Sequence, residues 1–183
     1  MNLQNLSLFQ ECFGEVGGEV QRLENAPLAR LNAPSLKYET SVPQLEYMCL
    51  MMENMVLTKK LKGNVYAGFQ KFSRAANVLD RFQAMTEFSN VTIFGENDMA
   101  MNPNDGIQYI ALPPESELMR EWFLIIDTPM FKSMMVAYDL EGFGVHTVEE
   151  GRKFKGIKTS SPAVISKAVS LLEPYVPSPL AAR

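Results

Sequence analysis

Hydrophobic residues near the start of the chain recur at alternating three- and four-residue steps. This spacing places them on one helical stripe with the period of a coiled-coil seam, so it predicts an amphipathic helix over residues 1–26. The stripe can contact a second copy of the chain or pack on its own domain, and we expect a homodimer. Three glycines, Gly14, Gly17 and Gly18, each weaken such a helix by about 1 kcal/mol relative to alanine, although they also permit close helix approach. The stripe consists of Leu6, Phe9, Phe13, Val16, Val20 and Leu23.

The next part of the chain alternates between strand and helix patterns. Ser41 and Gln44 have the spacing of a capping box, which predicts the start of a long helix. The order strand, helix, strand at short spacing is typical of a parallel pair joined by a right-handed crossover. The predicted elements are a strand over 36–40, a helix over 41–61, a strand over 65–70, a helix over 73–88 and a strand over 91–95.

The second half of the chain has strand patterns with short connections, which favour antiparallel pairing. Ser161 and Pro162 supply an N-cap and a first-turn proline for a last helix. The sequence therefore predicts a mixed α/β domain over 36–176, with a central sheet of about five or six strands flanked by helices, and a flexible tail over 177–183. The predicted elements are strands over 107–112, 122–127, 133–140 and 153–159 and a helix from 163 to about 175.

Composition limits the classes of function. A hydrophobic content of 46% is enough to build a core, and the net charge of −4 with scattered basic residues does not suit a nucleic-acid surface. Cys12 and Cys49 give neither a disulfide framework nor a metal-binding spacing, and nowhere do about 18 apolar residues follow one another without interruption. We expect a cytoplasmic protein that does not bind nucleic acid directly and does not enter a membrane.

Candidate catalytic chemistry is scarce. His146 is the only histidine and lies in a predicted loop. It offers no partner for a serine–histidine or cysteine–histidine arrangement and no ligand spacing for zinc. We therefore expect no catalytic residue, no metal and no cofactor, and the chain is predicted not to be an enzyme.

The ends of the two predicted parallel strands are the best candidates for a binding site, because ligands of open α/β sheets favour the crevice beyond the carboxyl ends of the strands. Aromatic, amide, hydroxyl, guanidinium and carboxylate groups meet there, a mixture typical of a small-molecule pocket. Alternatively, Ser73 caps the following helix and the carboxylates are solvated. The candidate ligand-binding residues are Phe69, Gln70, Phe72, Ser73, Arg74, Glu96, Asp98 and Trp122.

A charged pair, Arg120 and Glu121, directly precedes the only tryptophan, Trp122, which opens a continuous apolar run. Neighbouring residues of a strand point to opposite faces of the sheet, so both charges cannot line one site within a strand. The pair is predicted to finish a short helical turn that leads into a buried strand.

Several segments, in their order along the chain, resemble the DICT domain, a sensory domain of diguanylate cyclases and two-component systems. They are residues 68–73, 91–95 with Asp98, 111–113, 118–124, 135–140 and 152–156.

The resemblance implies a bacterial signal-input module, found in many relatives beside diguanylate cyclase, kinase or DNA-binding output domains, in light-related or other environmental responses. The 183 residues contain no output domain. We therefore expect a non-catalytic sensor that binds a small ligand or protein partner and acts on a separate kinase, diguanylate cyclase or transcription regulator. Two alternatives are a metal-dependent enzyme that uses the strand-end carboxylates Glu96 and Asp98, and a pure protein-interaction adaptor.

Overall fold

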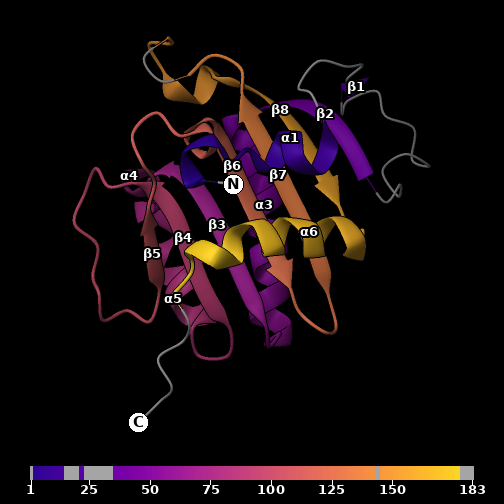
Figure 1. Ribbon diagram of the computed structural model, residues 1–183, viewed down its shortest axis with the longest axis vertical. Helices are drawn as coiled ribbons and strands as arrows, with labels where there is room; N and C mark the ends of the chain where they lie inside the picture. The colour runs from indigo at the N-terminus through magenta and orange to yellow at the C-terminus, as the bar shows by residue number, and fades with distance from the viewer. Residues whose placement is uncertain (1, 15–20, 23–34, 143–144, 178–183) are drawn as a thin grey trace.

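The computed structural model describes residues 2–14, 21–22, 35–142 and 145–177 (Figure 1). Its helical elements are η1 (Leu3–Asn5), α1 (Leu8–Phe13), α3 (Val42–Lys59), α4 (Phe72–Ala75), η3 (Ala76–Val78), α5 (Leu79–Met85), η4 (Glu117–Arg120), η5 (Glu149–Gly151), α6 (Pro162–Leu172) and η6 (Glu173–Tyr175), where η marks a 3-10 helix. Its strands are β1 (Gln21–Arg22), β2 (Ser35–Ser41), β3 (Asn64–Lys71), β4 (Asn90–Glu96), β5 (Gln108–Ala111), β6 (Glu121–Asp127), β7 (Lys132–Asp139) and β8 (Lys153–Thr159).

The strands form one mixed sheet, in the order β1-β2-β8-β7-β6-β3-β4-β5 within the described part of the chain. Strands β3, β4 and β5 are parallel neighbours, whereas β3, β6, β7, β8 and β2 pair in antiparallel fashion. The predicted α/β class, the parallel pair and the antiparallel second half are therefore confirmed. The predicted number of five or six strands is too low: the described residues form eight, including the two-residue β1 and the four-residue β5 at the edges of the sheet.

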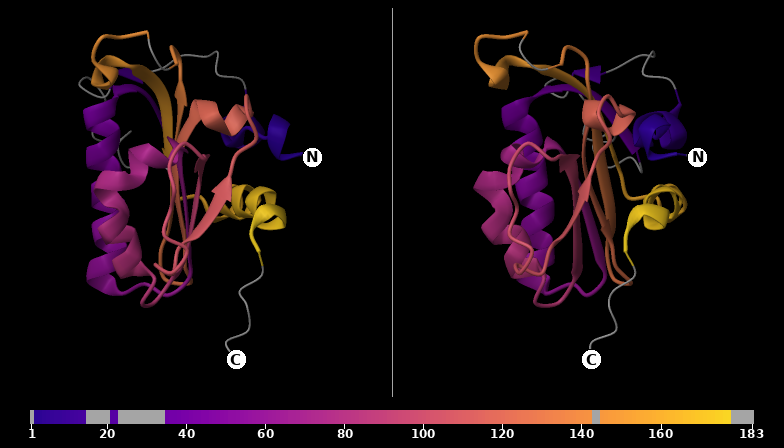
Figure 2. Two further views of the ribbon diagram at one scale, coloured as in Figure 1. Left: turned by 90° about the vertical axis from the view of Figure 1, so that its left-hand side faces the viewer. Right: turned by 60° about the vertical axis from the view of Figure 1, so that its left-hand side comes forward.

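Helices cover both faces of the sheet, so two hydrophobic cores form (Figure 2). The first core lies under α3 and α5, and the second lies under α1 and α6. Strand β6 contributes to both, because alternate side chains of a strand point to opposite faces. Trp122 and Leu124 belong to the first core, while Phe123 and Ile125 belong to the second.

The long helix α3 begins where the sequence predicts it. The backbone N–H of Ser41 donates to the Gln44 side chain at 3.2 Å, which is one half of the capping box, and Pro43 stands in the first turn. The helix is followed by Lys60 in the left-handed conformation. Gly63 then allows the chain to pass close to β6, because a Cβ atom there would lie 2.5 Å from the carbonyl oxygen of Asp127.

The helix predicted over 73–88 is not continuous. Two short helices, α4 and α5, are separated by the 3-10 turn η3. The turn contains Asn77 and Val78, and both residue types have lower helix propensity than the straight-chain residues around them. Phe82 and Met85 of α5 are buried, as expected for the apolar face of the predicted helix. Ala76, which the continuous helix would place on the same face, is exposed.

The continuous helix predicted over 1–26 is wrong, because the described parts of that range beyond Phe13 are not helical. Helix α1 has only six residues and ends at Gly14, whose φ of 81° is unfavourable for residues with a side chain. Further along, Gln21 and Arg22 pair with β2 as a parallel strand. The backbone conformation of Gly14 thus ends the helix, although the apolar spacing in the sequence continues beyond it.

The stripe assigned to a dimer contact is partly used inside the chain. Leu6 and Phe9 are buried in the second core, so these two pack on their own domain. Phe13 is half-buried and its ring meets that of Phe9 at a centroid distance of 6.2 Å. The other members, Val16, Val20 and Leu23, lie outside the described residues, as do residues 178–183 of the predicted tail. The homodimer stays a prediction.

A buried carboxylate holds α1 against the sheet. Glu121, the first residue of β6, is fully buried and accepts hydrogen bonds from the backbone N–H groups of Leu8 at 2.9 Å and Phe9 at 3.1 Å, and from the Ser7 hydroxyl. These N–H groups have no partner within a helix, so an acceptor from outside stabilises the first turn. The predicted turn is confirmed for Arg120, which ends η4, whereas Glu121 already belongs to the strand.

A second buried charge network joins the carboxyl ends of β3 and β7 to the start of β8. Arg152 and Asp139 are both fully buried and form an ion pair, and the Gln70 side chain bonds to both, at 3.2 Å in each case. Glu149 pairs with the Arg152 Nε atom at 2.9 Å, and Arg120 donates to the Asp139 carbonyl at 2.7 Å. Each charge is compensated inside the chain, as buried charges require.

We predict that Glu121→Gln reduces the pH dependence of stability. Burial raises the pKa of Glu121 from 4.5 to about 7, against the opposing hydrogen bonds from Ser7, Phe9 and Leu8. The folded state then binds the proton more tightly than the unfolded chain, so this contribution to stability is fully present below pH 4.5 and is lost as the pH rises through 7. At about 1.4 kcal/mol for each tenfold change in proton affinity, urea unfolding of the wild type should lose ~3 kcal/mol relative to the variant over this interval. The exposed Glu87→Gln is the control; parallel pH profiles for wild type and Glu121→Gln would contradict the assignment.

Asp139→Asn should destabilise the fold strongly. The substitution leaves Arg152 buried without its main counter-charge, and removal of one partner of a buried ion pair costs about 3–5 kcal/mol. The matched control is Glu149→Gln, because the Glu149 side chain is 41% exposed and binds the same guanidinium. We expect the control to lose less than about 1 kcal/mol in urea denaturation. Equal losses in the two variants would show that burial does not decide the effect.

Candidate functional site

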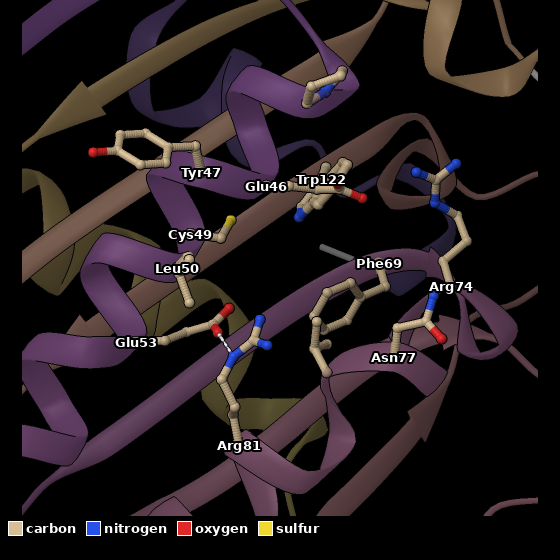
Figure 3. Close-up of a pocket in the computed structure, with 12 residues that line it drawn as sticks. Glu46, Tyr47, Cys49, Leu50, Glu53, Phe69, Arg74, Asn77, Arg81 and Trp122 are labelled. Atoms are coloured by element: carbon tan, nitrogen blue, oxygen red, sulfur yellow. Dashed lines mark hydrogen bonds and ion pairs between the residues drawn. The ribbon is translucent and has the colours of Figure 1, made fainter.

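A pocket of about 430 Å³ lies between α3 and the α4–η3–α5 segment, with β3 and β6 behind it (Figure 3). Its walls combine aromatic, aliphatic and charged side chains, as small-molecule pockets do. The lining residues are Pro43, Glu46, Tyr47, Cys49, Leu50 and Glu53 from α3, Arg74, Asn77, Val78 and Arg81 from α4 to α5, and Phe69 and Trp122 from the sheet.

The aromatic wall follows from the strand register. Gly68 of β3 stands opposite Phe123 of β6, so Phe69 and Trp122 come beside each other on the face that α3 covers. Their ring centroids are 6.3 Å apart, and the Arg74 guanidinium lies 5.2 Å from the centroid of the indole ring. The wall is therefore held by packing from several elements.

The charges that line the pocket balance one another. Glu53 is 1% exposed and accepts a hydrogen bond from the Arg81 Nε atom at 2.6 Å (Figure 3). Burial raises the pKa of Glu53, and the hydrogen bond and charge of Arg81 oppose that rise. Burial likewise lowers the pKa of Arg74, which the positive charge of Arg152 lowers further and the negative charge of Glu46 opposes. The pocket lining thus contains the guanidinium groups of Arg74 and Arg81 and the carboxylates of Glu46 and Glu53, so its formal charges balance.

One buried polar group of the pocket lacks a strong acceptor. Trp122 is 5% exposed, and its indole Nε1–H has no oxygen or nitrogen acceptor among the described residues; its partner there is the Cys49 sulfur. Figure 3 shows the indole nitrogen on the side of the ring toward Cys49. Burial raises the pKa of Cys49 well above its ordinary value, so its sulfur stays a protonated thiol, which is only a weak acceptor.

A second, polar hollow of about 500 Å³ adjoins the pocket at the strand ends and shares Glu46, Arg74 and Asn77 with it. Ser73 and Asp98 line this hollow. They bond to each other, because Asp98 accepts from the backbone N–H of Ser73 at 2.9 Å and from its hydroxyl. Asp98 thereby holds the first turn of α4.

The structure brings only some of the predicted ligand residues together. Phe69, Arg74 and Trp122 line the pocket, and Ser73, Arg74 and Asp98 line the hollow. Three others have partners within the protein.

Gln70 is 1% exposed, has a positive φ of 67° and bonds to the buried network and to the Met119 carbonyl. Phe72 is 2% exposed and packs edge-on against Tyr109, while Glu96 pairs with Lys71 at 3.1 Å. These three side chains do not line the pocket or the hollow.

Sequence reasoning missed the helical walls. Glu46, Cys49, Leu50 and Glu53 recur at three- and four-residue steps, which places them on one side of α3. This spacing was visible, but it mixes charged and apolar residues and so does not stand out from an ordinary amphipathic helix. Nothing in the sequence singled out Arg81, because the helix over 73–88 was predicted to be continuous and the break at η3 was not predicted.

Two features are absent from the described residues. No group of three or more His, Cys, Asp or Glu side chains in that part of the chain could hold a metal ion. No helix there is long and apolar enough to cross a membrane.

Comparison with solved structures shows a known fold. A polyphosphate kinase from Porphyromonas gingivalis superposes with a TM-score of 0.55 at 12% identity, over 88% of this chain and 29% of that one. NucT from Helicobacter pylori has a TM-score of 0.49 at 12% identity, over 77% of this chain and 95% of that one. TrmBL2, an archaeal chromatin protein with a novel mode of DNA binding, has a TM-score of 0.49 at 11% identity, over 76% of this chain and 52% of that one. The chain thus spans about a third to half of the length of two of these proteins.

Family comparison gives the sharper result. The family described as the sensory domain in diguanylate cyclases and two-component systems, DICT, matches residues 23–140. The chain belongs to the DICT family, so the resemblance predicted from the sequence motifs is confirmed, and with it a signal-input role. Among curated proteins nothing matches.

Arg81→Gln should destabilise the protein by about 1–3 kcal/mol at pH 7.5, because the buried Glu53 loses a charged hydrogen-bond partner. Without Arg81 the pKa of Glu53 rises further, so the loss should shrink as the pH falls and Glu53 takes up a proton. Arg81→Lys keeps the charge and is the control. Chemical denaturation at pH 7.5 and pH 5 measures both variants; a loss that is independent of pH would argue against the pairing.

Proposed function

We propose that this chain is a non-catalytic signal-input domain whose sensing site is the pocket between α3 and α5. A small molecule binds against Phe69 and Trp122, and its presence is relayed to a separate output protein such as a kinase, a diguanylate cyclase or a transcription regulator. The observation that carries the proposal is the pocket itself, about 430 Å³ of space beside an aromatic wall in a domain of a sensory family.

Helix α3 is suited to transmit the state of the pocket. One side of it lines the pocket, while Met51 and Met55, which are not among the lining residues, expose 55% and 40% of their surface. A ligand that changes how α3 packs on the sheet would also change the surface that these side chains present. Such coupling requires that the ligand binds the two packing states with different affinity.

The chemistry of the pocket favours binding over catalysis. Glu53 is paired with Arg81, and the Cys49 thiol is held in its unreactive protonated form by burial. His146, the only histidine of the chain, does not line the pocket and lies beside Glu141, with 2.5 Å between Nε2 and the carboxylate. A homodimer, a cytoplasmic location and a role in light or environmental responses remain predictions.

Native mass spectrometry of the protein purified from its own host tests the sensing site. We expect a retained small molecule on the wild type. Asn77→Phe should abolish it, because the exposed Asn77 lines the pocket and a phenyl ring there blocks the opening.

The matched control is Ala76→Phe, which adds the same ring at the neighbouring exposed position of η3, outside the pocket lining. It should retain the molecule. A bare mass for the wild type, or retention by Asn77→Phe, would contradict the assignment of the pocket as the sensing site.

A further inference from the structure

The indole of Trp122 indicates what the pocket accepts. A buried donor without a good acceptor costs about 1–3 kcal/mol, so native structures rarely leave one without a role. The Nε1–H of Trp122 has no oxygen or nitrogen acceptor among the described residues, and its partner there is the protonated thiol of Cys49, which accepts only weakly. An acceptor oxygen or nitrogen of a molecule in the pocket would bind this donor more strongly than the thiol does.

The charge balance of the pocket disfavours a charged occupant. Glu53 already uses Arg81, and Glu46 opposes the positive charge of Arg74. An anion such as a phosphate would meet two carboxylates, and a cation would meet two guanidinium groups. Either would have to break an existing pair or stay unpaired in a partly dry site, which is costly.

The walls favour a flat molecule. The Phe69 ring is 5% exposed beside the indole, and the Arg74 guanidinium lies over the indole face. Aromatic rings and guanidinium planes pack best against other planar groups. A volume of about 430 Å³ is in the range of pockets for small organic ligands.

We propose that the occupant is an uncharged, planar aromatic molecule with a carbonyl oxygen that accepts a hydrogen bond from the Trp122 Nε1–H. This inference rests on the proposed function and deepens it, because it gives the chemical class of the signal. The donor, the neutral surroundings and the flat walls each restrict the ligand independently.

Trp122 is the only tryptophan, so the side-chain indole signal in a ¹H–¹⁵N correlation spectrum belongs to it alone. Three probes share one bicyclic skeleton: 1-indanone has the carbonyl, indane lacks it, and indane-1-carboxylate adds a charge. We expect 1-indanone to move the indole proton downfield and to bind about tenfold more tightly than indane, the difference that one net hydrogen bond of about 1.4 kcal/mol makes. The carboxylate should bind no better than indane.

Two variants locate the effect. Asn77→Phe should weaken the binding of 1-indanone at least about tenfold, by closing the pocket, while Ala76→Phe should leave it unchanged. Trp122→Phe keeps an aromatic ring but removes the donor, so 1-indanone and indane should bind with equal affinity in ligand-observed spectra. If Trp122→Phe does not fold, the shift of the wild-type indole proton still decides.

Several results would overturn the inference: equal affinity of indane and 1-indanone for the wild type, binding that leaves the indole proton unmoved, tighter binding of the carboxylate, or no binding of any probe. The proposed function can survive this failure. A molecule retained from the host and lost in Asn77→Phe would keep the pocket as the sensing site with a different ligand class. A host protein without any retained molecule, together with no binding of the probes, would end both proposals.

Discussion

The ion pair between Arg152 and Asp139 is the constraint on which the pocket end of the sheet depends. Both side chains are fully buried, so neither charge is solvated and each must be met by protein groups. Gln70 completes the network, and this fixes the carboxyl end of β3 in a conformation with positive φ. The next residues enter α4 directly from that point, so the network also determines where Arg74 stands over Trp122. The polar end of β3, predicted as part of a ligand site, thus supports the wall of the adjacent pocket from inside the protein.

Much of the fold could be predicted because its signals are local. Apolar runs indicated the central strands, and the capping box at Ser41 located the start of α3. The N-terminal helix failed for a physical reason: apolar spacing describes a face but not what covers it. Leu6 and Phe9 are covered by their own domain. Gly14 ends the helix after six residues, and the apolar spacing alone could predict neither outcome.

The site was less predictable, because its contacts join residues far apart in the sequence. The strand-end rule found Phe69 and Arg74 of the pocket, and Trp122 was predicted as a candidate beside them. The same rule wrongly placed Gln70 in the ligand site. Its partner Arg152 lies 82 positions away, and no local sequence pattern predicts such a pairing. The pair of Glu53 and Arg81 was missed for the same reason, since 28 residues separate them.

The contact of Glu121 with the start of α1 has a consequence for the order of folding. It joins the Glu121 side chain to backbone N–H groups that lie 112 and 113 positions earlier in the chain, so closing that loop early would cost more entropy than forming any neighbouring hairpin. A six-residue helix has little stability of its own, so it gains structure only when β6 already presents its carboxylate. We therefore expect α1 to dock late and to detach before the sheet unfolds, which makes α1 a separate cooperative unit from the sheet. The face of the sheet opposite the pocket would then lose its N-terminal cover while the pocket between α3 and α5 stays intact.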